Sequence, residues 1–155
     1  MRWLIHDDGT FSLLDGPVSL RSAYPAIDGG SVRPVRVEVT RTAKGGVIRY
    51  TLAEGYLDVE LECDAQGMTV ATRLGGRAAA PWRVAPLGDG TLDGAARCIR
   101  QGQGWGGPSG ALDLPASEKV ESYGLAALLT EDGTALVLAA HDCRRFTQMT
   151  VLATV

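Results

Sequence analysis

A glycine-rich stretch, residues 101–110, contains the residue types best suited to ligand chemistry. It reads Gln-Gly-Gln-Gly-Trp-Gly-Gly-Pro-Ser-Gly, so five of its ten residues are glycine. Glycine is costly in a regular strand or helix because it loses the most backbone entropy on folding. The stretch therefore predicts a loop that displays Trp105, whose aromatic face suits a sugar ring. Gln101, Gln103 and Ser109 would bind the polar edges of that sugar, while a Trp that only covers the end of the core is the alternative interpretation.

The same loop lacks the context of two familiar motifs. Three of its glycines match the GxGxxG spacing of dinucleotide-binding loops, but that motif requires a helix that starts at the loop. Pro108 and the residues after it do not favour a helix. Ser109 is not in a GxSxG nucleophile motif, because Ala111 stands where the second glycine belongs. We therefore expect neither a cofactor nor a catalytic residue here.

Histidine and cysteine are too sparse for a metal centre. The two histidines, His6 and His141, belong to no HxxxH or HExxH spacing, and the three cysteines form no CxxC. Cys63, Cys98 and Cys143 are instead expected to be small buried hydrophobic residues in a reducing compartment. The sequence thus predicts no metal site and no disulfide framework.

The carboxylates do not single out an acid and a nucleophile for glycoside hydrolysis. Asp58, Glu60 and Glu62 alternate along one expected strand, which is typical of a solvated strand face. His141 precedes Asp142 at the end of another expected strand, where Asp142 would cap the strand or pair with Arg144 or Arg145.

The overall charge makes some partners improbable. The chain of 155 residues has 15 Lys and Arg against 18 Asp and Glu, a net charge of -3 and a pI of about 5.3. No basic patch of the kind that binds phosphate backbones is evident, so nucleic acid is not an expected partner. No signal peptide is visible, and Leu125–Ala140 is too short and too charged to span a bilayer. We expect a cytoplasmic protein without a membrane anchor.

Turn signals and period-two alternation predict an all-β chain. Six Asp-Gly pairs punctuate the sequence, and Asp-Gly between alternating apolar residues is a strong hairpin signal. Val35, Val37 and Val39 are expected on the inner face of one strand. The other alternating rows expected to face inward are Ile48-Tyr50-Leu52, Leu57-Val59-Leu61-Cys63 and Met68-Val70-Thr72-Leu74.

The predicted fold is one antiparallel β-sandwich domain over residues 1–155, with ten or more strands and essentially no helix. Trp82–Leu87 is expected at a sheet edge because prolines bound it. Ala95–Gln101 is ambiguous between a strand and a helical turn. Glu121–Thr130 and Ala135–Ala140 predict a hairpin around Asp132-Gly133, and Trp3 and Trp82 are expected to pack on the core or a sheet.

An ordered series of segments in the last third of the chain resembles a known family. The series comprises the Gln101–Ser109 loop, Glu121–Leu129, the Asp132-Gly133 hairpin and His141–Phe146. It is similar to the amino-terminal β-supersandwich, a galactose-mutarotase-like fold, of glycoside hydrolase family 36, the α-galactosidase or melibiase group.

The resemblance implies that a catalytic (β/α)₈ barrel follows the sandwich and carries both catalytic aspartates. The loop around Trp105 would help to shape the galactose pocket in its own or a neighbouring subunit. A barrel alone takes about 250 residues, so residues 1–155 are expected to be a non-catalytic part of a longer α-galactosidase-like enzyme. Its partners would be the barrel, an α-galactoside and further copies of the chain. The alternatives are a stand-alone carbohydrate-binding sandwich and a structural or interaction sandwich.

Overall fold

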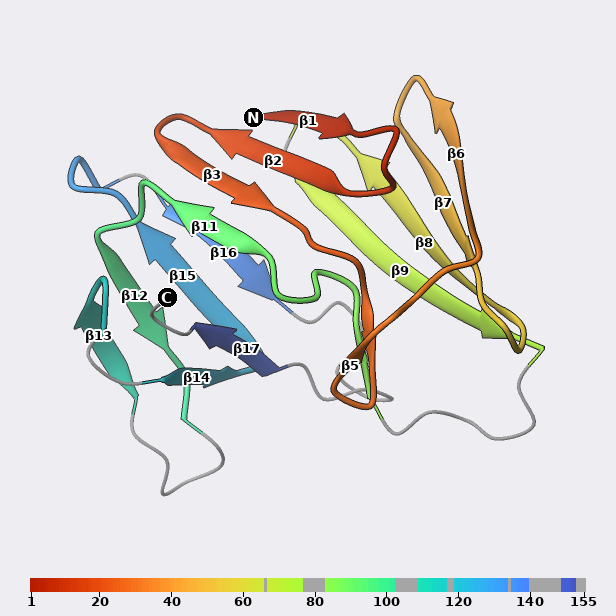
Figure 1. Ribbon diagram of the computed structural model, residues 1–155. Helices are drawn as coiled ribbons and strands as arrows, with labels where there is room; N and C mark the ends of the chain where they lie inside the picture. The colour runs from red at the N-terminus through yellow and green to blue at the C-terminus, as the bar shows by residue number, and fades with distance from the viewer. Residues whose placement is uncertain are drawn as a thin grey trace. The chain divides into compact units, whose positions relative to one another are not determined.

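The computed structural model describes residues 1–65, 67–76, 83–102, 109–116, 119–133, 135–139 and 149–152. Every regular element in these ranges is a β-strand, and every strand pair with a defined register is antiparallel (Figure 1). The all-β, antiparallel prediction is therefore confirmed. Within these ranges there is no helix that could cross a membrane.

The chain divides into two compact units. The first comprises Met1–Asp15 and Ser19–Leu92, and the second comprises Gly16–Val18 and Asp93–Val155. The expectation of one domain over 1–155 stays a prediction, and each unit is described by itself.

The largest sheet of the first unit is an antiparallel meander. Its strands are β6 (Arg36–Thr42), β7 (Gly45–Thr51), β8 (Tyr56–Cys63) and β9 (Met68–Gly75), in that order. Sheet β1-β2-β3-β11 contains β1 (Arg2–Ile5), β2 (Phe11–Asp15), β3 (Val18–Arg21) and β11 (Thr91–Asp93). A small sheet, in the order β10-β4-β5, contains β4 (Ala26–Ile27), β5 (Gly30–Ser31) and β10 (Val84–Ala85), so β10 lies at an edge as predicted.

One hydrophobic cluster joins strands of different sheets in the first unit. Ile5 and Phe11 come from the β1–β2 hairpin, and they are buried together with residues of β7 and β8. Trp3 packs against this cluster, as predicted, whereas Trp82 lies outside the described residues. The buried members are Ile5, Phe11, Val32, Ile48, Tyr50, Leu57, Val59 and Leu61.

The alternation places most inward residues correctly, with two corrections. The first concerns the inward rows, in which Thr72 of the edge strand β9 is exposed. Leu57, Val59, Leu61 and Cys63 are all buried, as predicted. Val35 is instead 74% exposed, because it precedes β6 and is not part of the cluster that buries the inner face.

The second correction concerns the outer face of β8. Asp58 is only 3% exposed, although the sequence predicts a solvated carboxylate. Its two oxygens each accept a hydrogen bond of 2.7 Å from the Arg49 guanidinium, which also lies 4.4 Å from the centre of the Tyr56 ring. This cross-strand pair covers Asp58 and satisfies its charge.

A tight turn links β4 to β5. Asp28 has a φ of 50° and Gly29 a φ of 85°, as two-residue hairpin turns with positive φ at both positions require. The Asp28 carboxylate accepts a 2.8 Å hydrogen bond from the Arg83 amide, and the Asp28 amide donates to the Arg83 carbonyl. The turn therefore also holds the start of β10 beside β4.

The second unit contains a four-stranded sheet in the order β13-β12-β15-β16. Its strands are β12 (Arg97–Arg100), β13 (Gly110–Asp113), β15 (Leu125–Leu129) and β16 (Ala135–Ala139). β15 and β16 form the hairpin predicted around Asp132-Gly133, and the ambiguous segment before residue 101 is a strand. A separate pair consists of β14 (Val120–Tyr123) and β17 (Met149–Leu152).

Candidate functional site

The two ends of the glycine-rich loop are held at a neck. The Gly102 amide donates a hydrogen bond of 2.9 Å to the Ser109 hydroxyl oxygen, which joins the residues on either side of positions 103–108. Ser109 itself is exposed, and Gly102 is buried. We define the loop neck as Gln101, Gly102, Ser109 and Ser122.

Strand β14 fixes the first residue of this neck. The Gln101 amide donates 2.8 Å to the Ser122 hydroxyl, and the Gln101 carbonyl accepts 2.9 Å from the Tyr123 amide. The Ser122 hydroxyl in turn donates to the Leu125 carbonyl, and Ser122 is 2% exposed. With both backbone groups of Gln101 paired, its side chain is displayed from a fixed backbone.

Glycine makes the turn between β14 and β15 possible. Gly124 has a φ of 82°, which L-residues with a side chain rarely adopt, and it lets the chain bend after Tyr123. Ser122 could not be predicted from the sequence, because a lone serine in a short strand carries no local signal for a loop-anchoring role.

The described residues include only some of the predicted site residues. Ser109 and Gln101 both lie in the loop neck. Ser109 accepts a hydrogen bond from Gly102, and Gln101 donates one to Ser122. Trp105 and Gln103 lie outside the described residues, as do His141 and Asp142.

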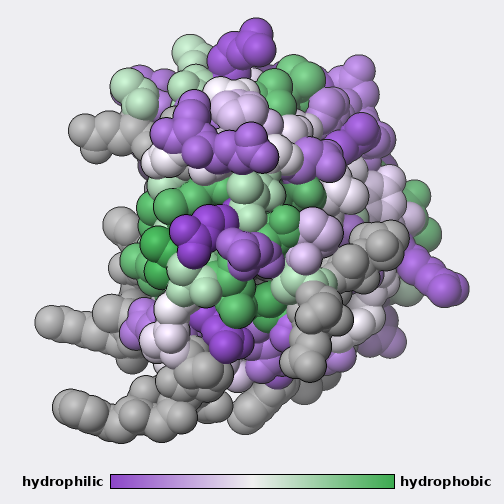
Figure 2. Space-filling model, turned by 90° about the vertical axis from the view of Figure 1, so that its left-hand side faces the viewer, coloured by the Kyte–Doolittle hydropathy of each residue, from purple (hydrophilic) through white to green (hydrophobic). Residues whose placement is uncertain are grey.

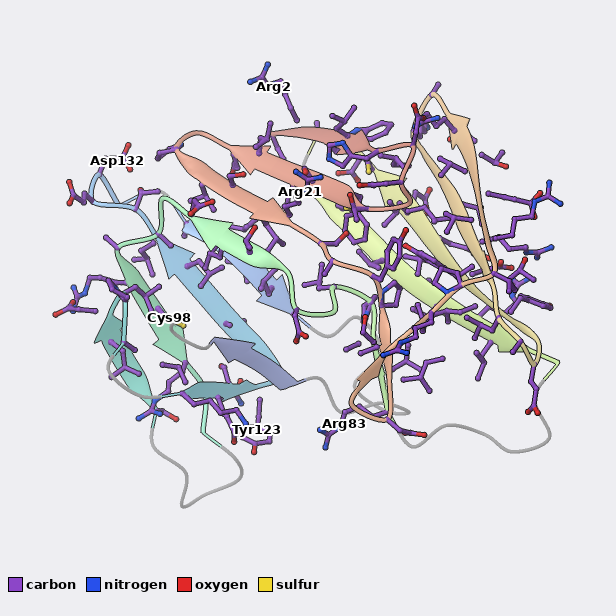
Figure 3. The ribbon with its side chains drawn as sticks, viewed as in Figure 1. Arg2, Arg21, Arg83, Cys98, Tyr123 and Asp132 are labelled. Carbon is purple, nitrogen blue, oxygen red and sulfur yellow. The ribbon has the colours of Figure 1, made fainter. Side chains whose placement is uncertain are left out.

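A charged group on β14 neighbours the neck in sequence. The Tyr123 hydroxyl donates a hydrogen bond of 3.1 Å to the Glu121 carboxylate, which also lies 2.8 Å from the Lys119 ammonium. Figure 3 labels Tyr123 on β14 and Cys98 on β12. The Glu121 charge is thus balanced by Lys119, which directly precedes β14.

A second polar cluster lies in the β1–β2 hairpin of the first unit. His6 Nε2 is 2.9 Å from the Ser12 hydroxyl, but Ser12 is buried in β2. The Asp8 carboxylate accepts hydrogen bonds from the Thr10 hydroxyl and amide, and these bonds lower the pKa of Asp8. The cluster closes the hairpin turn and leaves no accessible nucleophile beside the histidine.

The outer face of the β6–β9 sheet has a shallow hollow of about 250 Å³. Thr42, Glu60, Glu62 and Thr69 contribute to its lining, and Glu60 is already paired with Arg73 at 3.3 Å. Over the described ranges, no three His, Cys, Asp or Glu residues are grouped so that they could hold a metal ion. The hollow therefore has the character of a solvated strand face.

Two of the cysteines should be unreactive in the folded protein. Cys63 and Cys98 are buried free thiols, and burial raises the pKa of both. Because the thiolate is the reactive form, a thiol reagent at pH 8 should modify neither residue within minutes, and both after unfolding in guanidinium. The number of modified thiols is measured in a Cys143→Ser variant, so that only Cys63 and Cys98 can react. Rapid modification of either thiol without denaturant would contradict their burial.

Comparisons with known proteins identify no relative. No protein-family model matches the chain, no curated protein matches its sequence, and no solved structure matches its fold. The loop neck is therefore interpreted from its own residues.

Proposed function

We propose that residues 1–155 form a non-catalytic antiparallel β-sandwich, of the supersandwich type, in an α-galactosidase-like glycoside hydrolase. The sandwich supports a catalytic barrel, and the glycine-rich loop helps to shape the sugar pocket. The observation that carries this proposal is the loop neck, where Ser109 joins the two ends of the loop and Ser122 ties Gln101 to β14. A loop with fixed ends can present Trp105 and Gln103 at reduced entropic cost on binding.

The core of the first unit supports the sandwich architecture. Residues of the β1–β2 hairpin and residues of β7 and β8 are buried in one cluster, as expected where two sheets share a core. Aromatic stacking on a sugar needs a ring displayed on a supported loop, and polar side chains at the neck then meet hydroxyl groups. Gln101 and Ser109, which are both exposed, have the donors and acceptors for that role.

The test is made on the full-length gene product, assayed with an α-galactoside. Trp105→Ala should raise KM at least tenfold, and Ser109→Ala should raise it by a smaller factor because it only loosens the neck. Ser31→Ala, an exposed serine in β5, is the matched control and should leave KM unchanged. Unchanged kcat and KM in Trp105→Ala would remove the sugar-contact role, and a full-length protein without glycosidase activity would remove the proposal.

An interaction sandwich is the second candidate, and one observation favours it. The face of the second unit's sheet that carries Ile99, Val137 and Leu125 leaves these side chains 41%, 51% and 39% exposed. Ile99 and Val137 both pair with Ala127, so they lie in one row across the sheet. Figure 2, viewed from the side of β12 and β13, shows apolar side chains gathered around a few hydrophilic ones. Binding of a galactoside by the full-length protein would distinguish the sugar function from this one.

A further inference from the structure

Arg100, the last residue of β12, is an unusual arginine in this chain. It is half-buried, and its Nε is buried with no hydrogen-bond partner among the residues that the structure describes. A buried polar group without a partner destabilises the folded protein, and more so when the group is charged. Such a group in a folded protein calls for a specific explanation, such as a bound ligand.

Other arginines show what normally meets this atom. Nε of Arg49 donates 2.7 Å to the Asp58 carboxylate, Nε of Arg97 lies 3.0 Å from the Asp113 carboxylate, and Nε of Arg41 donates to a backbone carbonyl. Arg49 uses Nε and Nη2 together, as a fork that fits both oxygens of one carboxylate. The Nε of Arg100 lacks such an oxygen among the described residues.

Small residues flank Arg100 on both sides. Its cross-strand neighbours are Gly110 on β13 and Ala126 on β15. A methyl group placed on Gly110 would meet no atom within 4 Å, so the space beside that residue is open. Neither neighbour has a side chain that could supply an acceptor or fill this space.

Arg100 also adjoins the loop neck. Gln101 follows it directly and has its backbone fixed by β14, and Ser109 directly precedes Gly110. Arg100 thus ends β12, Gln101 follows that strand, and Ser109 precedes β13. A guanidinium is a donor only and prefers carboxylate or phosphate oxygens.

We propose that Arg100 binds the oxyanion of a negatively charged sugar, a carboxylate or a phosphate, at the loop neck. This inference rests on the proposed sugar function and adds that the ligand is acidic. The binding supplies the acceptor that the Arg100 Nε lacks.

The experiment titrates the full-length protein with three matched probes: galactose, galacturonic acid and galactose 6-phosphate. They differ at carbon 6, which is neutral, a carboxylate or a phosphate. At least one acidic probe should bind tenfold or more tightly than galactose, and added salt should reduce this preference. Preference for galacturonic acid alone identifies a carboxylate ligand, and preference for galactose 6-phosphate alone identifies a phosphate.

Arg100→Gln should abolish the preference, and Arg100→Lys should retain part of it because the charge stays while the fork is lost. Arg97→Gln is the control, since it removes the same charge from the same strand but from an arginine already paired with Asp113. Protection of Cys98, which neighbours Arg100 two residues away on β12, reports that each variant is folded.

Equal binding of all three probes, or a preference that survives Arg100→Gln, would overturn the inference. The proposed function fails separately: in that case the Trp105→Ala variant binds galactose as well as the wild type does. If Trp105→Ala loses galactose binding while Arg100→Gln keeps the wild-type preference among the three probes, the sugar function stands and only the acidic ligand is removed.

Discussion

Replacing Tyr50 with alanine should lower the free energy of unfolding of the first unit by about 3–5 kcal/mol, as removal of a buried aromatic ring typically does. Tyr50 is fully buried in the cluster shared by the β1–β2 hairpin and strands β7 and β8. Its ring meets that of Tyr24 edge-on, with 5.9 Å between centroids, and adds contact energy beyond the buried area. Chemical unfolding followed by circular dichroism measures the loss.

Tyr50→Phe isolates the hydroxyl. The Tyr50 hydroxyl donates a hydrogen bond to the Gly9 carbonyl inside the protein. Phenylalanine keeps the ring but leaves that carbonyl without its donor, so we expect a loss of about 1–3 kcal/mol. A loss in Tyr50→Phe as large as that in Tyr50→Ala would mean that ring packing contributes little, contrary to the burial.

The stabilities of the wild type and of Tyr50→Phe should also depend differently on pH in alkaline solution. Burial, aided by Tyr24 and Asp8, raises the pKa of Tyr50 well above its ordinary value of 10.0. Between the unfolded and folded pKa values the unfolded chain has released the proton and the folded chain has not, so stability falls as pH rises above about 10. The Phe variant lacks this contribution, and the stability gap between wild type and variant should therefore narrow with pH. A constant gap from pH 8 to pH 11 would contradict the raised pKa.

The long strands could be predicted because their hydrophobic period matches their burial. In β8, Leu57, Val59 and Leu61 alternate with polar residues, and all three are buried. Val35 continues the alternating row of Val37 and Val39 but is exposed. Alternation shows which way a side chain points but not whether another element covers it. Asp58 points outward as predicted, but its burial depends on Arg49 directly across the sheet. That register is not visible in the sequence.

Short elements escaped prediction because they contain too few residues to show a period. β4 and β5 have two residues each; they pair with each other, and β4 also pairs with β10. β12 was ambiguous for a related reason: its four residues suit a strand or a helical turn, and pairing with β13 and β15 on both sides decides for the strand.

The candidate site was predictable only in part. Glycine content marks the loop, and Ser109 was named from its place in it. Ser122 matters because it accepts a hydrogen bond from Gln101, which is far from it in the sequence. Arg100 matters because its buried Nε has no hydrogen-bond partner among the described residues. Such relations depend on the tertiary fold, which residue type and spacing do not specify.

Replacing Gly45 with alanine should destabilise the first unit by about 3 kcal/mol. Gly45 begins β7, between β6 and β8, with a φ of 145°. A methyl group there would lie 1.9 Å from the Leu61 carbonyl oxygen, a backbone atom of the neighbouring strand that cannot rotate away. The expected loss combines about 1–2 kcal/mol of backbone strain with about 1–3 kcal/mol of overpacking.

Gly29→Ala is the control that separates these two contributions. Gly29 lies in the same unit with a φ of 85°, but a methyl group on it would meet nothing within 4 Å. It should therefore cost only the strain of its positive φ, about 1–2 kcal/mol. Equal losses in the two variants, measured by urea unfolding under the same conditions, would show that β7 and β8 separate without cost at Gly45. A clearly larger loss in Gly45→Ala would show that the hairpin and its neighbouring strand are held too closely for any side chain, which keeps the register of the whole meander fixed.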